Sequence, residues 1–564
     1  MAESLFAGSP EDLEAFVKSR RLHAPTVVAL VVTLALAAPW AQAPSSRAAT
    51  SAAAPGGAAP SAGIAAERLD LDAIYKIKQE GFERSQVMET LSYLTDVHGP
   101  RLTNSPNIRN AAEWAMKRLN AWGITSARKE TWGPFGRGWS NEKFTANVLT
   151  PQPFPLIAFT KAWAPGTNGA VTADAIIAVI ETEADFSQWT GKLKGRIVLA
   201  SKPPEVRALF SPLGRRFTPD DLKDLEKQPE PRSQQERPPY HPPPGPSTRS
   251  RMEFYAREGV VAVLEPGTGR SDHGAILVSG PRELREPNAT PQPPQIVVAS
   301  EHYGRIARTL EKNIPVTIEL NVQNRYYDET LDSFNVIAEI PGTDKADEVV
   351  MLGAHFDSWH AGTGATDNAA GSAAMLEAMR ILTSTGLATR RTVRLALWTG
   401  EEQGLLGSRA YVKQQFGDAE TMQLKPAHAK LSGYFNMDNG MGAIRGVYLQ
   451  SNEAVRPVFA AFMSPFENAG MTTLAIRNTG ATDHIAFDEV GVPGFQFIQD
   501  PVEYSGYSHH TNMDLYERVQ AQDMMKNAVI IASFVYHTAN RDERLPRKPL
   551  PPPRRPGRPT SSAP

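Results

Sequence analysis

Side chains that can bind metal ions or move protons follow several apolar runs of this sequence. They are His355 and Asp357 after the run 349–354, Asp367 in a Gly-rich loop, Glu401 and Glu402 after the run 393–398, Asp438 after the run 431–437, and His509 and His510 in a Ser-His-His-Thr loop. A lone acidic residue at such a position is usually an N-cap or a solvated loop residue. Five strand ends that each supply an oxygen or nitrogen ligand instead indicate one shared site.

The residue types favour metal chemistry without sulfur ligands. The chain contains no cysteine, so histidine and carboxylate side chains must hold any metal. Two zinc ions about 3.5–4 Å apart need one bridging carboxylate, and each ion needs an imidazole or carboxylate of its own. The Glu401-Glu402 pair offers one ligand and one base that can take a proton from an attacking water. Asp357 stands two residues after His355, where we expect its carboxylate to hold the far imidazole nitrogen.

The overall composition describes a folded chain with balanced charge. Of 564 residues, 41% are hydrophobic, and 59 Lys and Arg stand against 61 Asp and Glu, for a net charge of -2. The apolar content excludes a wholly disordered chain, and the charge gives no indication of nucleic acid or an anionic membrane as a partner. Without cysteine, disulfide scaffolds and cysteine nucleophiles are excluded. Roughly 475 residues remain between the low-complexity ends for one large domain and one smaller one.

The two ends of the chain predict segments outside the folded part. Basic residues ahead of the apolar run 27–38 and an Ala-Gln-Ala site predict a signal peptide near residues 17–43, behind a polar N-terminal extension, and hence a secreted or periplasmic protein. The alternative is an uncleaved N-terminal membrane anchor. Residues 44–66 predict a flexible linker, and the Pro/Arg-rich residues 544–564 predict a disordered tail.

The segments that position the candidate residues alternate between strands and helices. Residues 67–131 show helical periodicity, residues 326–543 alternate apolar strands with helices, and we expect both parts to form one catalytic domain. This favours an α/β fold with a mainly parallel mixed sheet sandwiched by helices, whose ligand site lies at the carboxyl ends of the strands. Residues 132–325 contain short β-like runs and predict a β-rich insert with a Pro-rich surface loop at 229–246.

A series of collinear motifs resembles one enzyme family. The motifs are Gly353-Ala-His-Phe-Asp-Ser-Trp, Gly364-Ala-Thr-Asp-Asn-Ala-Ala-Gly, Trp398-Thr-Gly-Glu-Glu-Gln-Gly-Leu-Leu-Gly-Ser, Asn436-Met-Asp, Gly480-Ala-Thr-Asp-His and His509-His-Thr-Asn-Met-Asp. They resemble the co-catalytic zinc aminopeptidases, and among these the dipeptidases like plasma glutamate carboxypeptidase (carboxypeptidase Q). The insert resembles the protease-associated domain through Lys192-Leu-Lys-Gly-Arg-Ile-Val and Phe254-Tyr-Ala-Arg-Glu-Gly-Val-Val-Ala. The likeness covers most of residues 71–540.

The resemblance implies a role for each candidate. It makes Asp367 the ligand that bridges two Zn²⁺ ions, His355 and Asp438 the other ligands of one ion, Glu402 and His510 those of the other, and Glu401 the catalytic base. It also implies a cis peptide bond between Asp367 and Asn368, which places Asn368 beside the ligands as a supporting residue. Close relatives suggest a homodimer.

His509 departs from the family pattern, in which a tyrosine often precedes the last histidine ligand. As a candidate catalytic residue it could donate a hydrogen bond to a tetrahedral oxyanion, or it could merely pack beside the ligand, and both alternatives stay open. His360 and His484 lie near the motifs in sequence, and we expect both to have hydrogen-bonded structural roles.

The sequence therefore predicts an exported di-zinc peptidase that cleaves dipeptides or short peptides next to a free N-terminus. The expected partner is a short peptide substrate, with no nucleic acid and no stable membrane span after signal cleavage. Three alternatives are a glutaminyl-cyclase-like acyltransferase with one zinc, a receptor-like homologue that has lost its metals, and an unrelated α/β protein with ordinary loop carboxylates. The complete ligand set, including a carboxylate at Asp438, argues against the first two, and the collinear motifs argue against the third.

Overall fold

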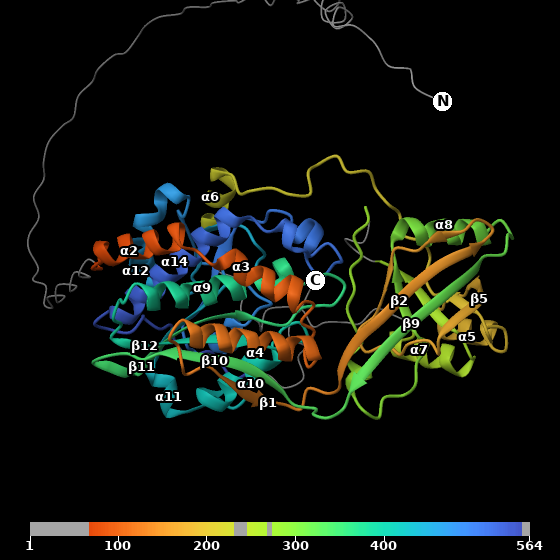
Figure 1. Cartoon of the computed structure of the whole chain (residues 1–564), viewed down its shortest axis with the longest axis horizontal. Coiled ribbons are helices and arrows are strands. Elements are labelled where there is room, and N and C mark those ends of the chain that lie inside the picture. Colours follow the sequence, from red (N-terminus) through yellow and green to blue (C-terminus); the bar gives the residue numbers. More distant parts are fainter. Residues whose placement is uncertain (1–66, 230–244, 268–272, 555–564) are drawn as a thin grey trace, which may run out of the picture. The chain divides into compact units, whose positions relative to one another are not determined.

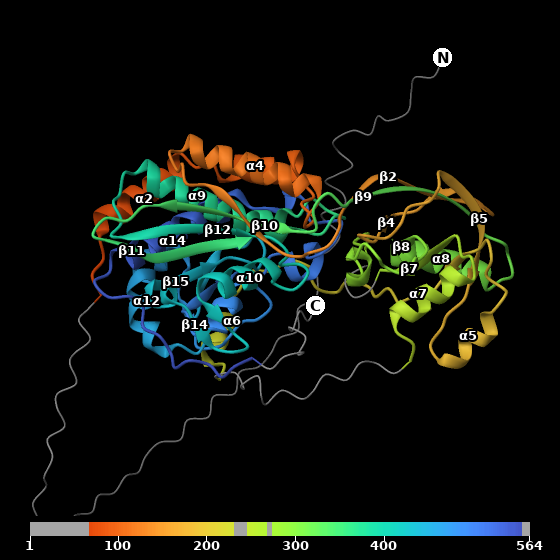
Figure 2. The same ribbon diagram turned by 90° about the horizontal axis from the view of Figure 1, so that it is seen from below.

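The computed structural model describes residues 67–229, 245–267 and 273–554. Within these residues two sheets of eight strands each form the framework, and β13 (Gly417–Asp418) pairs with β14 (Gln423–Leu424) in a small third sheet. Figures 1 and 2 show the strands of both large sheets with their helices. The predicted signal peptide and linker lie outside the described residues, as does most of the predicted Pro-rich loop.

The first sheet is mixed and has a parallel centre. Its order is β1 (Arg128–Trp132), β10 (Ser333–Ile340), β12 (Arg391–Trp398), β11 (Lys345–His355), β15 (Leu431–Asn436), β18 (Gly494–Gln499), β16 (Ile444–Tyr448) and β17 (Thr473–Ala475). The four strands β12, β11, β15 and β18 are mutually parallel, whereas β1 and β10 pair antiparallel at one side and β16 pairs antiparallel with β18. Every residue of β15 and the last six of β11 are buried, which explains their continuous apolar sequence.

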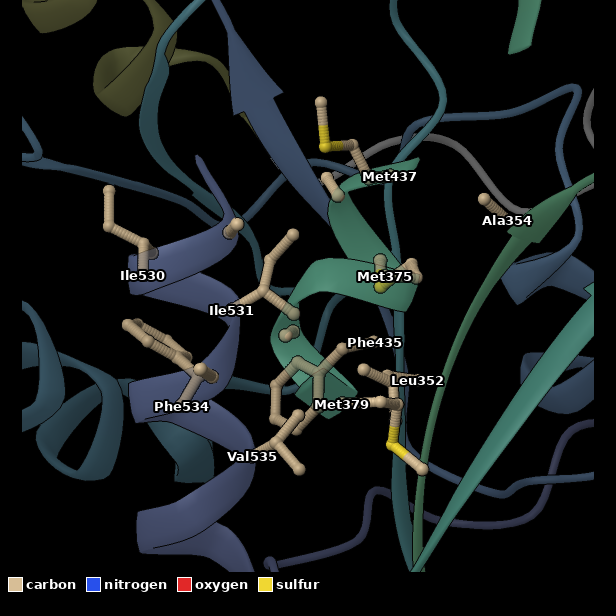
Figure 3. Packing of buried hydrophobic residues seen from close by; sticks show 14 of the residues in the cluster. Leu352, Ala354, Met375, Met379, Phe435, Met437, Ile530, Ile531, Phe534 and Val535 are labelled. Atoms are coloured by element: carbon tan, nitrogen blue, oxygen red, sulfur yellow. The ribbon is translucent and has the colours of Figure 1, made fainter. Parts of the chain in front are cut away.

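Helices cover both faces of the first sheet. On one face α9 (Ala370–Ser384) and α14 (Ala521–Asn540) pack on the central strands, where Met379 and Phe534 lie near Leu352 and Phe435 (Figure 3). The same core includes residues of α2 (Leu71–Glu83), α3 (Val87–Ser92), α4 (Pro106–Ala121) and α12 (Arg456–Met463). A second core contains residues of α10 (Leu406–Gln415) and α13 (His484–Asp488), with α11 (Pro426–Lys430) packed against it. Each fully buried large apolar side chain contributes about 1.5–3 kcal/mol, so these cores fix the strand ends firmly.

The predicted α/β fold with a mixed sheet between helices is therefore confirmed. None of the helices formed by the described residues is long and apolar enough to cross a membrane.

The second sheet is formed by residues from the segment expected to be a β-rich insert. Its order is β3 (Phe154–Pro155), β2 (Gly138–Thr150), β9 (Thr317–Tyr327), β5 (Ala170–Ile177), β6 (Ile197–Leu199), β7 (Ala262–Pro266), β8 (Gln295–Val298) and β4 (Ala158–Thr160). The helices of this region are α5 (Glu183–Trp189), α7 (Thr248–Arg257) and α8 (Ser300–Leu310). Two hydrophobic clusters of residues from this region pack on the second sheet.

Part of the expected insert contacts elements of the first sheet instead. Arg216 forms ion pairs of 3.0 Å with Asp500 and 2.8 Å with Asp523, both of which are nearly buried. The following helix α6 (Pro219–Lys227) contributes Glu226, which accepts a hydrogen bond from the backbone N–H of Leu474 at 3.3 Å. Ion pairs and a hydrogen bond thus connect this part of the expected insert to the expected catalytic domain.

The start of the predicted disordered tail is packed. Leu545 is 2% exposed, and its backbone N–H donates to the Ser432 hydroxyl at 3.1 Å. The guanidinium of Arg547 donates to the carbonyl oxygen of Leu431 at 2.6 Å. The prediction of disorder is therefore corrected for residues 544–554, because one apolar residue and its basic neighbours find partners beside β15 that composition alone does not reveal.

Candidate metal centre

His355 and Asp438 lie at the carboxyl ends of two neighbouring parallel strands. His355 is the last residue of β11, and Asp438 follows β15, which pairs with β11. The Nε2 atom of His355 is 3.3 Å from Oδ1 of Asp438 and 4.0 Å from Oε2 of Glu401. The Ser372 hydroxyl of α9 donates to the carbonyl oxygen of His355 at 2.8 Å. The sheet itself therefore brings these side chains together, as expected for strand ends in an α/β fold.

Asp367 lies between the two histidine-bearing segments and presents one carboxylate oxygen to each. Its Oδ1 is 3.1 Å from Nε2 of His355, and its Oδ2 is 3.2 Å from Nε2 of His510. The peptide bond between Asp367 and Asn368 is cis, as the resemblance implies. The Asn368 side chain donates to the carbonyl oxygen of Met437 at 2.9 Å, which ties this loop to the residue before Asp438.

Glu401 and Glu402 occupy the turn after β12, and Asp357 organises that turn. The Asp357 carboxylate accepts hydrogen bonds from the backbone N–H groups of Glu401 at 3.2 Å and Glu402 at 3.3 Å. The Thr103 hydroxyl donates to the same carboxylate at 2.8 Å and accepts from the backbone N–H of Gly400 at 3.2 Å. Two side chains thus hold three successive N–H groups of the turn.

The support that Asp357 gives to His355 differs from the prediction. The Nδ1 atom of His355 is 3.0 Å from the carbonyl oxygen of Asp357 but 3.7 Å from the nearest oxygen of its carboxylate. The carboxylate is turned toward the loop after β12, where three donors are available to it. The backbone carbonyl therefore orients the imidazole, and the carboxylate positions the two glutamates.

The histidine loop (residues 508–512) is held by a segment of the expected insert. The backbone N–H of Asn512 donates to the carbonyl oxygen of Ile276 at 3.2 Å. The Asn512 side chain accepts from the N–H of Ile276 at 2.6 Å and donates to the carbonyl oxygen of Gly274 at 3.1 Å. One side chain thus holds two backbone groups of the neighbouring segment, as a paired strand would.

This loop brings both of its histidines to the carboxylates. The Nε2 atom of His510 is 2.9 Å from Oε2 of Glu402, in addition to its contact with Asp367. The Nε2 atom of His509 is 3.6 Å from Oδ2 of Asp367. His510 adopts a left-handed backbone conformation with φ of 61°, which turns its side chain relative to that of its neighbour. All seven residues named as catalytic or metal-binding candidates, namely Glu401, His509, His355, Asp367, Glu402, Asp438 and His510, therefore meet at one place.

Burial and mutual charges shift the pKa values of these groups. Burial raises the pKa of Glu401 well above its usual range, and it raises the pKa of Glu402 to about 7. Burial alone would lower the pKa of His510, but the charges of Glu402 and Asp367 outweigh it and raise the pKa to about 10. These carboxyl groups and imidazoles therefore hold protons more tightly than usual, and bound cations would favour the ionised carboxylates instead.

The arrangement of the polar atoms in the cluster suits metal binding better than hydrogen bonding among the side chains. Oδ2 of Asp367 and Oε1 of Glu402 are buried and have no regular hydrogen-bond partner among the described residues. Three overlapping groups have ligand atoms within 4.8 Å of one another: Asp367 with His509 and His510, His355 with Glu401 and Asp438, and His355 with Asp367 and Glu402. Nitrogen and carboxylate donors without sulfur suit zinc.

His360 and His484 lie outside these groups, as the sequence analysis expects. Nε2 of His360 is 2.7 Å from the carbonyl oxygen of Thr160, and Nε2 of His484 is 3.1 Å from that of Thr479. Burial lowers the pKa of both imidazoles to about 4. Both are therefore neutral, hydrogen-bonded residues at neutral pH.

Three buried residues that the sequence analysis does not name as candidates also support the centre. Besides Thr103, Asp514 accepts from the backbone N–H of Asp367 at 3.2 Å, and Arg101 donates to the carbonyl oxygen of Gly364 at 2.9 Å. Burial raises the pKa of Asp514 to about 7, and the charge of Asp367 adds to this. Asp514 closes the last motif, which is a signal that could have singled it out. Arg101 and Thr103 stand in a Gly-Pro-Arg-Leu-Thr stretch that predicts only a helix end.

Comparisons with known proteins agree with the motifs. Residues 335–535 match the model of Peptidase family M28. Carboxypeptidase Q of Pongo abelii is 25% identical over 483 residues, which cover 84% of this chain and 90% of that protein. The crystal structure of a peptidase M28 precursor from Shewanella amazonensis SB2B superposes with a TM-score of 0.60 at 25% identity, covering 85% of this chain and 98% of that one.

A more distant likeness concerns the fold alone. A zinc aminopeptidase from Bacillus subtilis has a TM-score of 0.52 at 18% identity and covers 81% of this chain and 95% of its own. The resemblance to carboxypeptidase Q is therefore confirmed over most of the chain, and residues 335–535 match Peptidase family M28.

Proposed function

We propose that this chain is a zinc-dependent peptidase that hydrolyses peptide bonds next to a free N-terminus. The observation that carries the proposal is Asp367, whose two carboxylate oxygens face His355 at 3.1 Å and His510 at 3.2 Å. A bridging carboxylate needs this arrangement if two metal ions are to share it. In this proposal the metal ligands are His355 and Asp438 on one side, Glu402 and His510 on the other, and Asp367 between them. The match to Peptidase family M28 and the likeness to carboxypeptidase Q support a metallopeptidase.

The two glutamates have separate duties in the proposed reaction. Zinc ions bound by the ligands would polarise the scissile carbonyl and lower the pKa of a water molecule. Glu401 accepts the proton of the attacking water as the new C–O bond forms. It then gives that proton to the nitrogen of the leaving amine as the C–N bond breaks. Because Asp357 holds both backbone N–H groups of the turn, Glu401 faces His355 while Glu402 faces His510.

The preference for short substrates with a free amine rests on the surroundings of the centre. The excess of carboxylates attracts a cationic α-amino group. Residues 274–276 of the insert contact the histidine loop, so the insert lies against the centre, where it would exclude long chains. We therefore propose dipeptides or short peptides as substrates. Long peptides cleaved as fast as dipeptides would contradict this preference.

The remaining features of the proposal come from the sequence. We propose that residues 132–325 form a protease-associated insert between the catalytic parts 67–131 and 326–543. The signal-like residues 17–43 support export, and a homodimer is proposed only from the family resemblance of the sequence.

The base assignment is tested by Glu401→Gln, which keeps the side-chain shape but removes the proton acceptor. Turnover of a dipeptide should fall by about 10²–10⁴-fold, while zinc content, measured by atomic absorption, should stay at two ions per chain. Glu311→Gln, at an exposed position of the insert, is the matched control and should behave as wild type. Near wild-type turnover of Glu401→Gln would remove Glu401 from the role of base, and a wild-type chain without metal would refute the zinc proposal.

A further inference from the structure

Two adjacent imidazole rings of the histidine loop face the same carboxylate oxygen. The rings of His509 and His510 are stacked with centroids 3.8 Å apart and an angle of 29° between their planes. Their Nε2 atoms lie 3.6 Å and 3.2 Å from Oδ2 of Asp367. Two nitrogen donors and one oxygen donor therefore converge within the reach of a single ion.

The carboxylate oxygen at this point faces both imidazole rings. Oδ2 of Asp367 is buried and accepts no hydrogen bond from the described part of the chain. One carboxylate oxygen of Asp367 and one imidazole nitrogen each of His509 and His510 all lie within 4.8 Å of one another. A donor to an oxyanion would aim its N–H at the substrate, whereas Nε2 of His509 lies beside an oxygen of the chain itself.

The backbone holds the His509 ring in this place. The backbone N–H of His509 donates to the carbonyl oxygen of Tyr504 at 3.0 Å, and the Tyr504 ring packs against the His509 imidazole with centroids 4.7 Å apart. The histidine loop is fixed on its other side by Asn512. The ring is therefore positioned in advance for a ligand, which lowers the ordering cost of binding.

We propose that His509 is an additional ligand of the metal ion held by His510, Glu402 and Asp367. This inference rests on the proposed function and replaces the oxyanion role considered from the sequence. It would give the histidine side of the centre four candidate donors, against three on the side of His355, Asp438 and Asp367. The two proposed ions would then leave different numbers of positions for water and substrate.

The test measures metal binding rather than activity alone. His509→Gln keeps a hydrogen-bond donor but is a poor zinc ligand. Zinc titration of metal-free protein against a chromophoric chelator should show one site of wild-type affinity and one weakened at least about tenfold, since even supporting residues of metal sites cost about 10–100-fold. Cobalt substitution should change the visible absorption of that site only. His302→Gln, in the insert, is the control and should bind both ions as wild type does.

The outcomes separate the possible roles of His509. If His509→Gln binds both ions with unchanged affinity, whether or not turnover falls, the ligand assignment is overturned. A wild-type chain that binds no metal would overturn the proposed function together with this inference. If the variant fails to fold, a zinc-loaded crystal structure of the wild type decides, because a ligand places Nε2 of His509 about 2.0–2.1 Å from the metal, and a longer separation contradicts the proposal.

Discussion

The two sides of the candidate metal centre are positioned by different parts of the molecule. The strand-end side (His355, Asp438 and the turn with Glu401 and Glu402) follows parallel strands of the first sheet, and Asp357 and Thr103 hold its backbone. The histidine side (His509 and His510) is separated from the last parallel strand by a longer loop, and a segment of the expected insert holds that loop.

This difference distinguishes ligands whose positions are fixed by the sheet alone from ligands whose positions also depend on a second region of the chain. Parallel strands end at one edge, so any residue directly after them lies near the others. A residue 10 positions beyond a strand, such as His509 after Gln499, is placed by whatever contacts its loop. The strand-end side should therefore depend on the first sheet alone, and the histidine side on the insert as well.

The largest effect that tests this comparison is expected from Asn512→Ala. The substitution removes both side-chain hydrogen bonds of Asn512 to the insert and leaves only the backbone ones, so the loop that carries His510 is held less firmly. Affinity for one of the two proposed zinc ions should fall by about 10–100-fold, as for other residues that orient metal ligands, and turnover should fall with it. Zinc titration measures the change.

Asn120→Ala, at an exposed position of α4, is the matched control for Asn512→Ala. Equal loss of both zinc ions in Asn512→Ala would contradict the comparison, because it would mean that the insert positions the strand-end side too.

A smaller effect on the other side is expected from Thr103→Val. Valine has nearly the same shape, but Asp357 loses one donor and the N–H of Gly400 loses its acceptor. A buried group left without a partner costs about 1–3 kcal/mol, so the free energy of unfolding should fall by that amount in a denaturant titration. Turnover should fall by up to about tenfold, because the turn with Glu401 is less well fixed. Zinc affinity at the side of His355, Asp438 and Asp367 should not change, because none of these ligands lies in the turn.

Thr103→Ser keeps the hydroxyl and is the matched control. It should restore most of the stability and turnover. A serine variant as impaired as the valine variant would show that the methyl group, and not the hydrogen bonds, supports the turn.

The smallest effect concerns the contact between His360, shortly after β11, and the second sheet. Its imidazole lies 2.7 Å from the carbonyl oxygen of Thr160 and packs edge-on against Trp139. Burial lowers its pKa from 6.5 to about 4 in the folded chain, so the unfolded chain binds this proton more readily. The stabilising contribution is present above pH 6.5 and is lost as the pH falls toward 4, by ~1–3 kcal/mol.

His360→Gln should flatten this pH dependence. Its free energy of unfolding should decrease less than that of wild type between pH 6.5 and 4, and the difference between the two proteins should be constant at pH 7 and above. Parallel curves over the acidic range would contradict the assignment of this proton to His360.

Much of the strand-end side could be predicted because its signal is local. The apolar run 349–354 predicts a buried strand, and His355 is indeed the last residue of β11. The alternation of strands and helices expected for residues 326–543 includes α9, whose Met375 and Met379 lie in the same core as Leu352. Each of these patterns needs only neighbours in sequence, because burial of both faces of a strand or one face of a helix leaves a periodic trace.

The supporting residues Thr103 and Arg101 could not be predicted because their partners are distant in the sequence. Thr103 reaches Asp357 across 254 positions, and Arg101 reaches Gly364 across 263. Spacing carries no information about such pairs, because the chain between them can take many paths. The packed position of Leu545 in the expected tail was missed on the same ground.

The sequence by itself determined which donors are available, that sulfur is not among them, and that most of them end apolar strands. Only the tertiary structure decided that Asp367 presents one oxygen to each histidine-bearing segment, that the Asp357 carboxylate holds the glutamate turn, and that His509 faces Asp367. The physical reason is that residue type and strand periodicity are set by local burial. The direction of a side chain in a loop is set instead by hydrogen bonds to segments that are distant in the chain.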